Sequence, residues 1–231
     1  MRPIRRVWIT RAQPGAARTA ARLTTLGFTP VVTPLLTLRP LPDALDAAPD
    51  LSTVAALAFT SPNGVAAFAA LTPELRALPV FAVGDATAEA AREAGFADAR
   101  SAAGDVHDLA RLIAATPVDG LILAPGAREP AGDLPALLPD HAVQRLPVYA
   151  AEETDAAAPA DFDAVLVHSP RAARALAAIL PPDAAQERLA VCISAAAAAP
   201  LHAFSFAEIR TASSPDETSM LTALGKSAGP V

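Results

Sequence analysis

Two short turns in this sequence carry side chains that could bind an anionic ligand. Thr60-Ser61-Pro62-Asn63-Gly64 follows one apolar run and His168-Ser169-Pro170-Arg171 follows another, with the two serines 108 positions apart. Each turn places a serine where its hydroxyl can cap a helix, and a proline at the first helical position, where its missing N–H costs nothing. Because a helix N-terminus presents free N–H groups and positive dipole charge, each turn predicts an anion-binding position.

Small polar residues recur where other predicted strands end. They are Thr10-Arg11, Gly84-Asp85-Ala86-Thr87, Pro125-Gly126-Ala127-Arg128 and Ser194. Any single one can simply cap a helix, which is the commoner role of such residues. Together with the two turns they make six positions at the carboxyl ends of parallel strands. This convergence favours a receptor for several anionic groups at once.

The sequence lacks the motifs of common nucleotide-binding and catalytic sites. It has neither a Gly-x-Gly-x-x-Gly pattern nor a phosphate loop, and Gly225-Lys226-Ser227 has no upstream glycine. Its histidines never pair at metal-ligand spacing, so no metal is expected. His168, at a strand end, is interpreted as part of a cleft wall rather than a general base. No serine stands in a nucleophile elbow, which argues against covalent hydrolase chemistry.

Tyrosine, tryptophan and cysteine each occur once. Tyr149 ends a predicted strand, and its phenol either points into a gap between domains or anchors the strand through a local hydrogen bond; both interpretations stay open. Trp8 is expected in the core. Cys192 is also expected to be buried, since a free cysteine behaves as a small hydrophobe. A lone cysteine excludes an intrachain disulfide framework and agrees with a reducing compartment.

The elements that must position these residues alternate between strand-like and helical segments, as in parallel sheets covered by helices. Ten strands are predicted, near residues 7–10, 29–36, 54–59, 80–83, 97–100, 120–123, 143–149, 164–167, 190–193 and 208–211. Helices are predicted after Ser61 and over 14–26, 85–94, 105–115, 131–138, 169–180 and 194–204. A last helix follows Ser214-Pro215-Asp216-Glu217, interpreted as a capping box.

The repeated turns predict duplication of an α/β unit. Two polar, proline-rich gaps, residues 39–52 and 152–161, are interpreted as crossings inside the repeats. The domains are then discontinuous: residues 1–38 with 152–231, and residues 39–151. The expected fold class is α/β, with two similar five-stranded parallel-sheet, flavodoxin-like domains joined by a two-stranded hinge and a substrate cleft between them.

Composition limits the partners of this chain. With 231 residues, 52% of them hydrophobic, it is long enough for two α/β domains. Its net charge of −6 argues against nucleic acid as a general partner. No apolar stretch approaches the roughly 20 residues that cross a bilayer, and the N-terminal arginines lead into a predicted strand rather than a signal sequence. A cytoplasmic protein without a membrane partner is expected.

The sequence resembles the uroporphyrinogen-III synthase family along almost its whole length. The segments that carry the resemblance are Ile9-Thr10-Arg11, Leu26-Gly27-Phe28, Thr60-Ser61-Pro62-Asn63-Gly64-Val65, Val83-Gly84-Asp85-Ala86-Thr87-Ala88, Gly95-Phe96, Gly132-Asp133-Leu134, Val148-Tyr149, Ser169-Pro170-Arg171 and Pro215-Asp216-Glu217. Each motif is weak alone, but their order and spacing together are specific. Residues 195–199 lack a threonine that many members have, and residues 125–130 lack a usual second glycine.

The resemblance implies an enzyme that converts the linear tetrapyrrole hydroxymethylbilane into uroporphyrinogen III. Water is lost and the last ring is inverted through a spiro intermediate. The resemblance implies that the enzyme uses no metal and no organic cofactor. It also implies a monomer that makes transient contact with the preceding deaminase. Because the substrate carries many carboxylates, helix N-termini and arginines at the site would explain how a chain of negative net charge binds it.

The resemblance also implies roles for individual residues. Tyr149 is expected to donate a hydrogen bond to the departing hydroxyl, since a phenol stays protonated at neutral pH. Arg11, Arg128 and Arg171 are expected to contact substrate carboxylates. The other expected substrate-binding residues are Thr60, Ser61, Asn63, Gly64, Gly84, Thr87, His168, Ser169 and Ser194. The alternatives are a non-catalytic module of the same fold that binds a tetrapyrrole or another polyanion, and a sugar or amino-acid binding protein.

Overall fold

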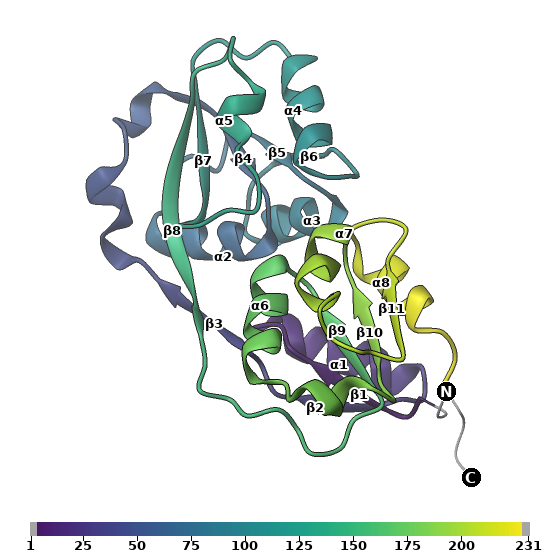
Figure 1. Ribbon diagram of the computed structural model, residues 1–231. Coiled ribbons are helices and arrows are strands. Elements are labelled where there is room, and N and C mark those ends of the chain that lie inside the picture. Colours follow the sequence, from purple (N-terminus) through teal and green to yellow (C-terminus); the bar gives the residue numbers. More distant parts are fainter. Residues whose placement is uncertain (1–3, 228–231) are drawn as a thin grey trace. The chain divides into compact units, whose positions relative to one another are not determined.

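The computed structural model describes residues 4–227 and divides into two compact units (Figure 1). Unit 1 comprises Met1–Leu38 and Glu152–Val231, and unit 2 comprises Arg39–Ala151. Each unit has a β-sheet of mainly parallel strands with helices packed against it, so the mixed α/β class with parallel sheets is confirmed.

The sheet of unit 1 has the strand order β11-β10-β9-β1-β2, and each neighbouring pair is parallel. Its strands are β1 (Arg6–Ile9), β2 (Thr29–Val32), β9 (Ala164–Val167), β10 (Leu189–Cys192) and β11 (Glu208–Thr211). Its α-helices are α1 (Gly15–Thr25), α6 (Pro170–Ile179), α7 (Ala195–Ala198) and α8 (Glu217–Leu224), with short 3-10 helices η3 (Pro182–Ala185) and η4 (Ala199–Leu201).

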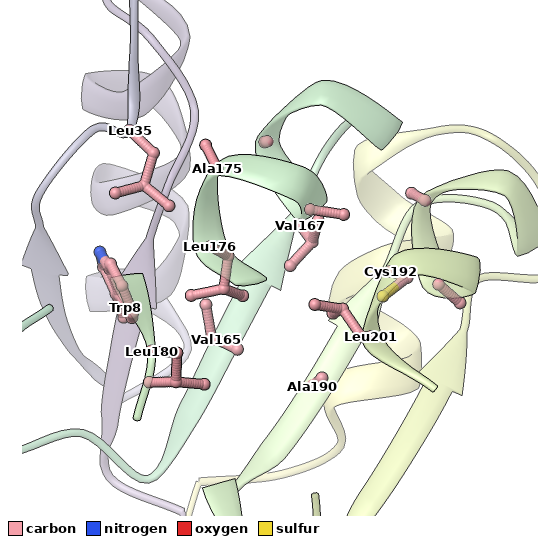
Figure 2. Packing of buried hydrophobic residues seen from close by; sticks show 14 of the residues in the cluster. Trp8, Leu35, Val165, Val167, Ala175, Leu176, Leu180, Ala190, Cys192 and Leu201 are labelled. Atoms are coloured by element: carbon pink, nitrogen blue, oxygen red, sulfur yellow. The ribbon is translucent and has the colours of Figure 1, made fainter. Parts of the chain in front are cut away.

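The inner strands β1, β9 and β10 bury both of their faces, because helices cover the sheet on both sides. Alternate residues of one strand therefore belong to different cores. Trp8 packs with residues of α6 and α7 on one face, whereas Ile9 packs with residues of α1 and α8 on the other. Figure 2 shows the first of these cores, in which Leu176 of α6 lies over Val165 and Cys192 lies beside Leu201. The expected burial of Trp8 and Cys192 is confirmed.

The sheet of unit 2 has the order β3-β8-β7-β4-β5-β6. Its strands are β3 (Leu36–Pro40), β4 (Val54–Phe59), β5 (Pro79–Ala82), β6 (Asp98–Ser101), β7 (Leu121–Ala127) and β8 (Val143–Glu153), and the boundaries between the units fall within β3 and β8. Its helices are α2 (Pro62–Leu71), α3 (Asp85–Glu93), α4 (Val106–Ala114) and α5 (Leu134–Leu137), with 3-10 helices η1 (Pro42–Ala47) and η2 (Leu51–Thr53). Phe81 packs with α4 and α5, and Phe59 packs on the rings of Phe68 and Phe96.

Each sheet contains a point where the chain changes the direction in which it adds strands. In unit 1 this point lies between β1 and β9, and in unit 2 it lies between β4 and β7. Open parallel sheets bind ligands outside the carboxyl ends of their strands at such a switch point. Residues 10–11 and 168–171 follow the two central strands of unit 1, and residues 60–64 and 125–128 lie at the ends of those of unit 2.

Three of the expected elements differ in the structure. In the described residues the second sheet has six strands rather than five, because residues 29–36 do not form one strand. Pro34 has no N–H for a sheet ladder, and the chain forms β2 before it and β3 after it. The predicted helix 194–204 is also interrupted: α7 gives way to a 3-10 turn that contains Pro200. The helix predicted over 131–138 is the single turn α5.

Candidate functional site

The two matched turns have nearly the same backbone geometry. Ser61 precedes α2 with φ −163° and ψ 153°, and Ser169 precedes α6 with φ −164° and ψ 156°. The Oγ of Ser61 accepts a hydrogen bond from Gly64 N (3.2 Å), and that of Ser169 accepts one from Ala172 N (3.1 Å). Over ten positions from each serine, the pattern of buried and exposed residues differs at one position. Both predicted helix caps are confirmed.

A second pair of turns corresponds in the same way. Gly84 precedes α3 with φ −159° and ψ 173°, and Ser194 precedes α7 with φ −158° and ψ 164°. Residues 81–90 and 191–200 have the same burial pattern at every position. Thr87 is only 2% exposed and its N–H donates to the Gly84 carbonyl. The Thr87 N–H therefore serves the first turn of α3, and the substrate-binding role of Thr87 stays a prediction.

Tyr149 and Ser61 contact each other in unit 2. Tyr149 lies on β8, is 9% exposed, and has its Oη 3.2 Å from the Oγ of Ser61, with either hydroxyl able to donate. Burial raises the pKa of Tyr149, and the hydrogen bond with Ser61 partly opposes that change. The phenol therefore stays protonated at neutral pH. Of the two interpretations of Tyr149, the local hydrogen bond is present in the structure.

The end of β7 lies beside this pair. Arg128 N donates to the Tyr149 carbonyl at 2.8 Å, while the Arg128 side chain is exposed. A Cβ at Gly64 would lie 2.9 Å from the Pro125 carbonyl oxygen, so a glycine is needed for α2 to pack this closely on β7. Thr60 lines a cavity of about 30 Å³ at the ends of β4 and β7.

The switch point of unit 1 carries charge instead of hydroxyl groups. Nη1 of Arg11 donates to Oε2 of Glu217 at 2.8 Å, and Nε2 of His168 lies 3.2 Å from the same oxygen. Exposed fractions of these side chains are 28% for Arg11, 19% for Glu217 and 7% for His168. Thr19 Oγ1 accepts a longer hydrogen bond, 3.5 Å, from Arg11 Nη1. We call Arg11, Glu217 and His168 the charged triad.

Burial decides the protonation state of His168, and its polar neighbours decide that of Glu217. Burial is the main cause that lowers the pKa of His168, so this imidazole is neutral at neutral pH. Burial alone would raise the pKa of Glu217, but hydrogen bonds from His168 and Thr19 and the positive charges nearby outweigh it and lower the pKa. Because an ionised carboxylate only accepts hydrogen bonds, Nε2 of His168 carries the proton in their contact. One positive and one negative charge remain, and they balance.

The remaining expected residues lie at the same strand ends, each within its own unit. Asn63 and Thr60 belong to the Ser61 turn, and Arg171 and Ser169 to the turn that opens α6. The N–H of Gly64 is already used by the Ser61 side chain and carbonyl, so it serves the helix first. The carboxylate-binding roles of these residues stay predictions.

Sequence reasoning missed the position of Glu217. The expected capping box with Ser214 is wrong, because Asp216 is the residue that caps α8, through a 2.8 Å bond from Ser219 N. Glu217 is the first helical residue and is free to bond Arg11, which is 206 positions earlier in the chain. The residues around Glu217 in the sequence do not indicate that its partner is Arg11. Conversely, the box that the structure does contain, between Asp105 and Asp108 at the start of α4, was not singled out.

The described residues also bear on metal binding, on the reactivity of the single thiol and on membrane spanning. No group of three or more His, Cys, Asp and Glu side chains within residues 4–227 could hold a metal ion. Burial raises the pKa of the Cys192 thiol to about 12, which leaves it unreactive at neutral pH. Among the helices that the structure describes, none is both long and apolar enough to span a bilayer.

Comparison with known proteins gives one family. The sequence model of uroporphyrinogen-III synthase HemD matches residues 17–222. The solved structure of uroporphyrinogen-III synthetase from Helicobacter pylori is similar with a TM-score of 0.65 and 17% identity, over 95% of this chain and 97% of that one. A mutant uroporphyrinogen III synthase from Thermus thermophilus is similar with a TM-score of 0.56 and 19% identity, again over 95% and 97%. No curated protein sequence matches.

Proposed function

The chain belongs to the uroporphyrinogen-III synthase family, and we propose that it cyclises hydroxymethylbilane to uroporphyrinogen III as a lyase of tetrapyrrole biosynthesis. Water leaves one end of the linear substrate, and the last ring is inverted through a spiro intermediate before closure. The observation that carries the proposal is the family match over residues 17–222. The matched strand-end turns, with Tyr149 against one of them, support it.

Tyr149 has the properties that loss of the terminal hydroxyl requires. A hydrogen-bond donor must be protonated and held in place, and Tyr149 is both, since burial raises its pKa and Ser61 contacts its Oη. The Ser61 oxygen already accepts from Gly64 N. When the Ser61 hydroxyl in turn donates to Tyr149, the phenol proton is free for the departing oxygen.

The substrate carboxylates need positive or donor groups, and this chain offers both kinds. Positive charge comes from three arginines. Arg11 follows β1, Arg128 follows β7, and Arg171 lies in the first turn of α6. Bidentate guanidinium–carboxylate contacts give orientation as well as affinity. Orientation matters here because the catalyst must hold the last ring so that its substituted carbon is attacked. The binding roles of Arg11, Arg128 and Arg171, and a cleft between the two units, stay predictions.

The proposed setting is a monomer in the cytoplasm that uses no metal or organic cofactor. It receives an unstable linear substrate from the preceding deaminase by transient contact. These points follow from the family and from the composition of the chain.

Separation of product isomers tests the proposed function. Hydroxymethylbilane is generated in situ with a deaminase, the protein is added, and the oxidised uroporphyrins are separated by chromatography. We expect predominantly the type III isomer. Type I alone, as in a control without the protein, would contradict the synthase and favour a module that binds tetrapyrroles without turnover.

A further inference from the structure

The Arg11 guanidinium is anchored through one of its nitrogens. Within the described residues, both of its hydrogen bonds come from Nη1, to Glu217 at 2.8 Å and to Thr19 at 3.5 Å. A guanidinium carries five N–H donors, and a carboxylate is bound best by two donors on one edge. The edge formed by Nε and Nη2 can thus take a second carboxylate while Glu217 holds Nη1.

Gly15 lies directly under that second edge. A Cβ at residue 15 would lie 2.5 Å from Nε, 2.7 Å from Cζ and 2.8 Å from Nη2 of Arg11. Contacts this short do not occur between real atoms, so the present place of the guanidinium, over the first turn of α1, requires a glycine at 15. The sequence alone gives this residue no role beyond a position in the predicted helix 14–26.

Glu217 fixes the guanidinium from the other side and comes from a distant part of the chain. Asp216 caps α8, which leaves the Glu217 carboxylate free to contact Arg11 and His168. Because Glu217 and Arg11 have opposite charges, their attraction offsets part of the free-energy cost of removing each from water. His168, 7% exposed, contacts the same carboxylate oxygen through Nε2 at 3.2 Å.

We propose that Gly15 and Glu217 are positioning residues for Arg11, which hold the Nε and Nη2 edge of its guanidinium in place for a carboxylate side chain of a tetrapyrrole. The proposal rests on the proposed function, and it adds two residues that act through Arg11. Glu217 supplies the anchor and Gly15 supplies the space.

The test is the substitution Gly15→Ala, alone and together with Arg11→Ala. The added methyl displaces the flexible end of one side chain, and alanine favours helix more than glycine does, so the protein should stay folded and its urea midpoint should fall no further than that of Arg11→Ala. We expect the KM for hydroxymethylbilane to rise about tenfold with kcat within about twofold of wild type, because a misplaced arginine weakens binding of one carboxylate. In the Arg11→Ala background, Gly15→Ala should change neither constant.

Glu217→Ala provides the second arm, with Glu208→Ala as its matched control. Glu208 pairs with Arg210 on β11 of the same unit, through bonds of 2.8 and 2.7 Å, and both are partly exposed. Glu217→Ala should raise KM as Gly15→Ala does, whereas Glu208→Ala should leave it unchanged. An unchanged KM in Gly15→Ala, or an effect that persists without the Arg11 side chain, would overturn the proposal.

Fluorescence titration with uroporphyrin III separates the proposal from the proposed function. If the wild-type protein yields no type III isomer but binds uroporphyrin III, the proposed function fails. The positioning roles of Gly15 and Glu217 are then still measured as changes in the Kd for uroporphyrin III. The proposal is supported if Gly15→Ala and Glu217→Ala raise the Kd in a protein that contains Arg11 and do not raise it in the Arg11→Ala background. Equal Kd values for wild type, Gly15→Ala and Glu217→Ala overturn it.

Discussion

The Ser61 turn of unit 2 and the Ser169 turn of unit 1 share a backbone but not a chemistry. Their serines have φ and ψ values within 3° of each other, and both cap the following helix. Around Ser61 the nearest functional partner is the neutral phenol of Tyr149, whereas the residue before Ser169 is His168 of the charged triad. The same helix-opening turn thus lies beside a neutral phenol in one unit and beside an ion pair in the other.

This difference teaches that the turn is a scaffold and that its neighbours decide its use. The helix caps need only a serine and a proline, which local sequence supplies. The neighbours come from far along the chain: Tyr149 is 88 positions from Ser61, and Glu217 is 49 positions from His168. We call the Ser61 turn with Tyr149 the neutral turn, and the Ser169 turn with the charged triad the charged turn. The neutral turn suits chemistry on a leaving hydroxyl, and the charged turn suits recognition of carboxylates.

The largest effect is expected at the neutral turn. Tyr149→Phe should lower kcat about a hundredfold, the usual contribution of a positioned proton donor, with the fold intact. The measurement is the rate of type III product formation under saturating substrate, with far-ultraviolet circular dichroism to check folding. Unchanged turnover would remove the donor role from Tyr149, and the two turns would then differ only in substrate binding.

The charged turn should respond most strongly in stability. Glu217→Ala leaves Arg11 and His168 partly buried without their carboxylate, so it should lower the free energy of unfolding by about 2 kcal/mol. Urea denaturation measures this change. Glu208→Ala, which breaks a more exposed pair with Arg210 in the same unit, should cost at most about 0.5 kcal/mol. Equal losses in the two variants would show that the charged triad is no more than a surface ion pair.

The shared scaffold itself should give equal, smaller effects. Ser61→Ala and Ser169→Ala each remove one helix cap, so each should lower the free energy of unfolding by about 1 kcal/mol. The two values should agree closely, because the caps have the same geometry. A much larger loss for Ser61→Ala would mean that its contact with Tyr149 carries structural as well as chemical weight.

The smallest effect expected is a pH dependence that belongs to the charged turn alone. Folding lowers the pKa of His168 below its ordinary 6.5, mainly through burial, so the unfolded chain binds more protons as the pH falls below that value. The contribution of His168 to stability is therefore present above pH 6.5 and is lost as the pH falls toward its folded pKa. Glu217, with a lowered carboxyl pKa, stays ionised in this window.

Urea midpoints at pH 7.5 and pH 5.5 check this prediction. The fall in stability between the two should be smaller in His168→Gln than in wild type. The chain has three other histidines, at 107, 141 and 202, none of which His168→Gln alters. An equal fall in both proteins would assign the dependence to other groups.

Local sequence was enough for the features that depend on neighbouring residues. Ser61 and Ser169 are the predicted caps, and Gly27 and Gly95 follow α1 and α3 with φ of +82° and +90°, as helix-ending glycines do. Parallel sheets were predictable because apolar runs alternate with helical segments. Pro34 and Pro200 were visible in the sequence, and their missing N–H groups account for the split strand and the shortened helix.

The parts of the site that depend on distant residues could not be predicted in this way. Glu217 fits a capping box in the sequence, yet Asp216 is the cap and Glu217 bonds Arg11. Gly15 has no turn or positive φ to mark it, and only the place of a guanidinium makes it necessary. Contacts between elements far apart along the chain decide both cases, and hydrophobic periodicity carries no information about them.

The single tryptophan and the single tyrosine of this chain fall in different units. Trp8 is fully buried on β1, and Tyr149 is nearly buried on β8. Each unit therefore carries its own optical reporter, without any label. Tryptophan fluorescence follows the melting of unit 1, and tyrosine absorption follows that of unit 2. One heated sample thus shows whether the two halves unfold in a single step or one after the other.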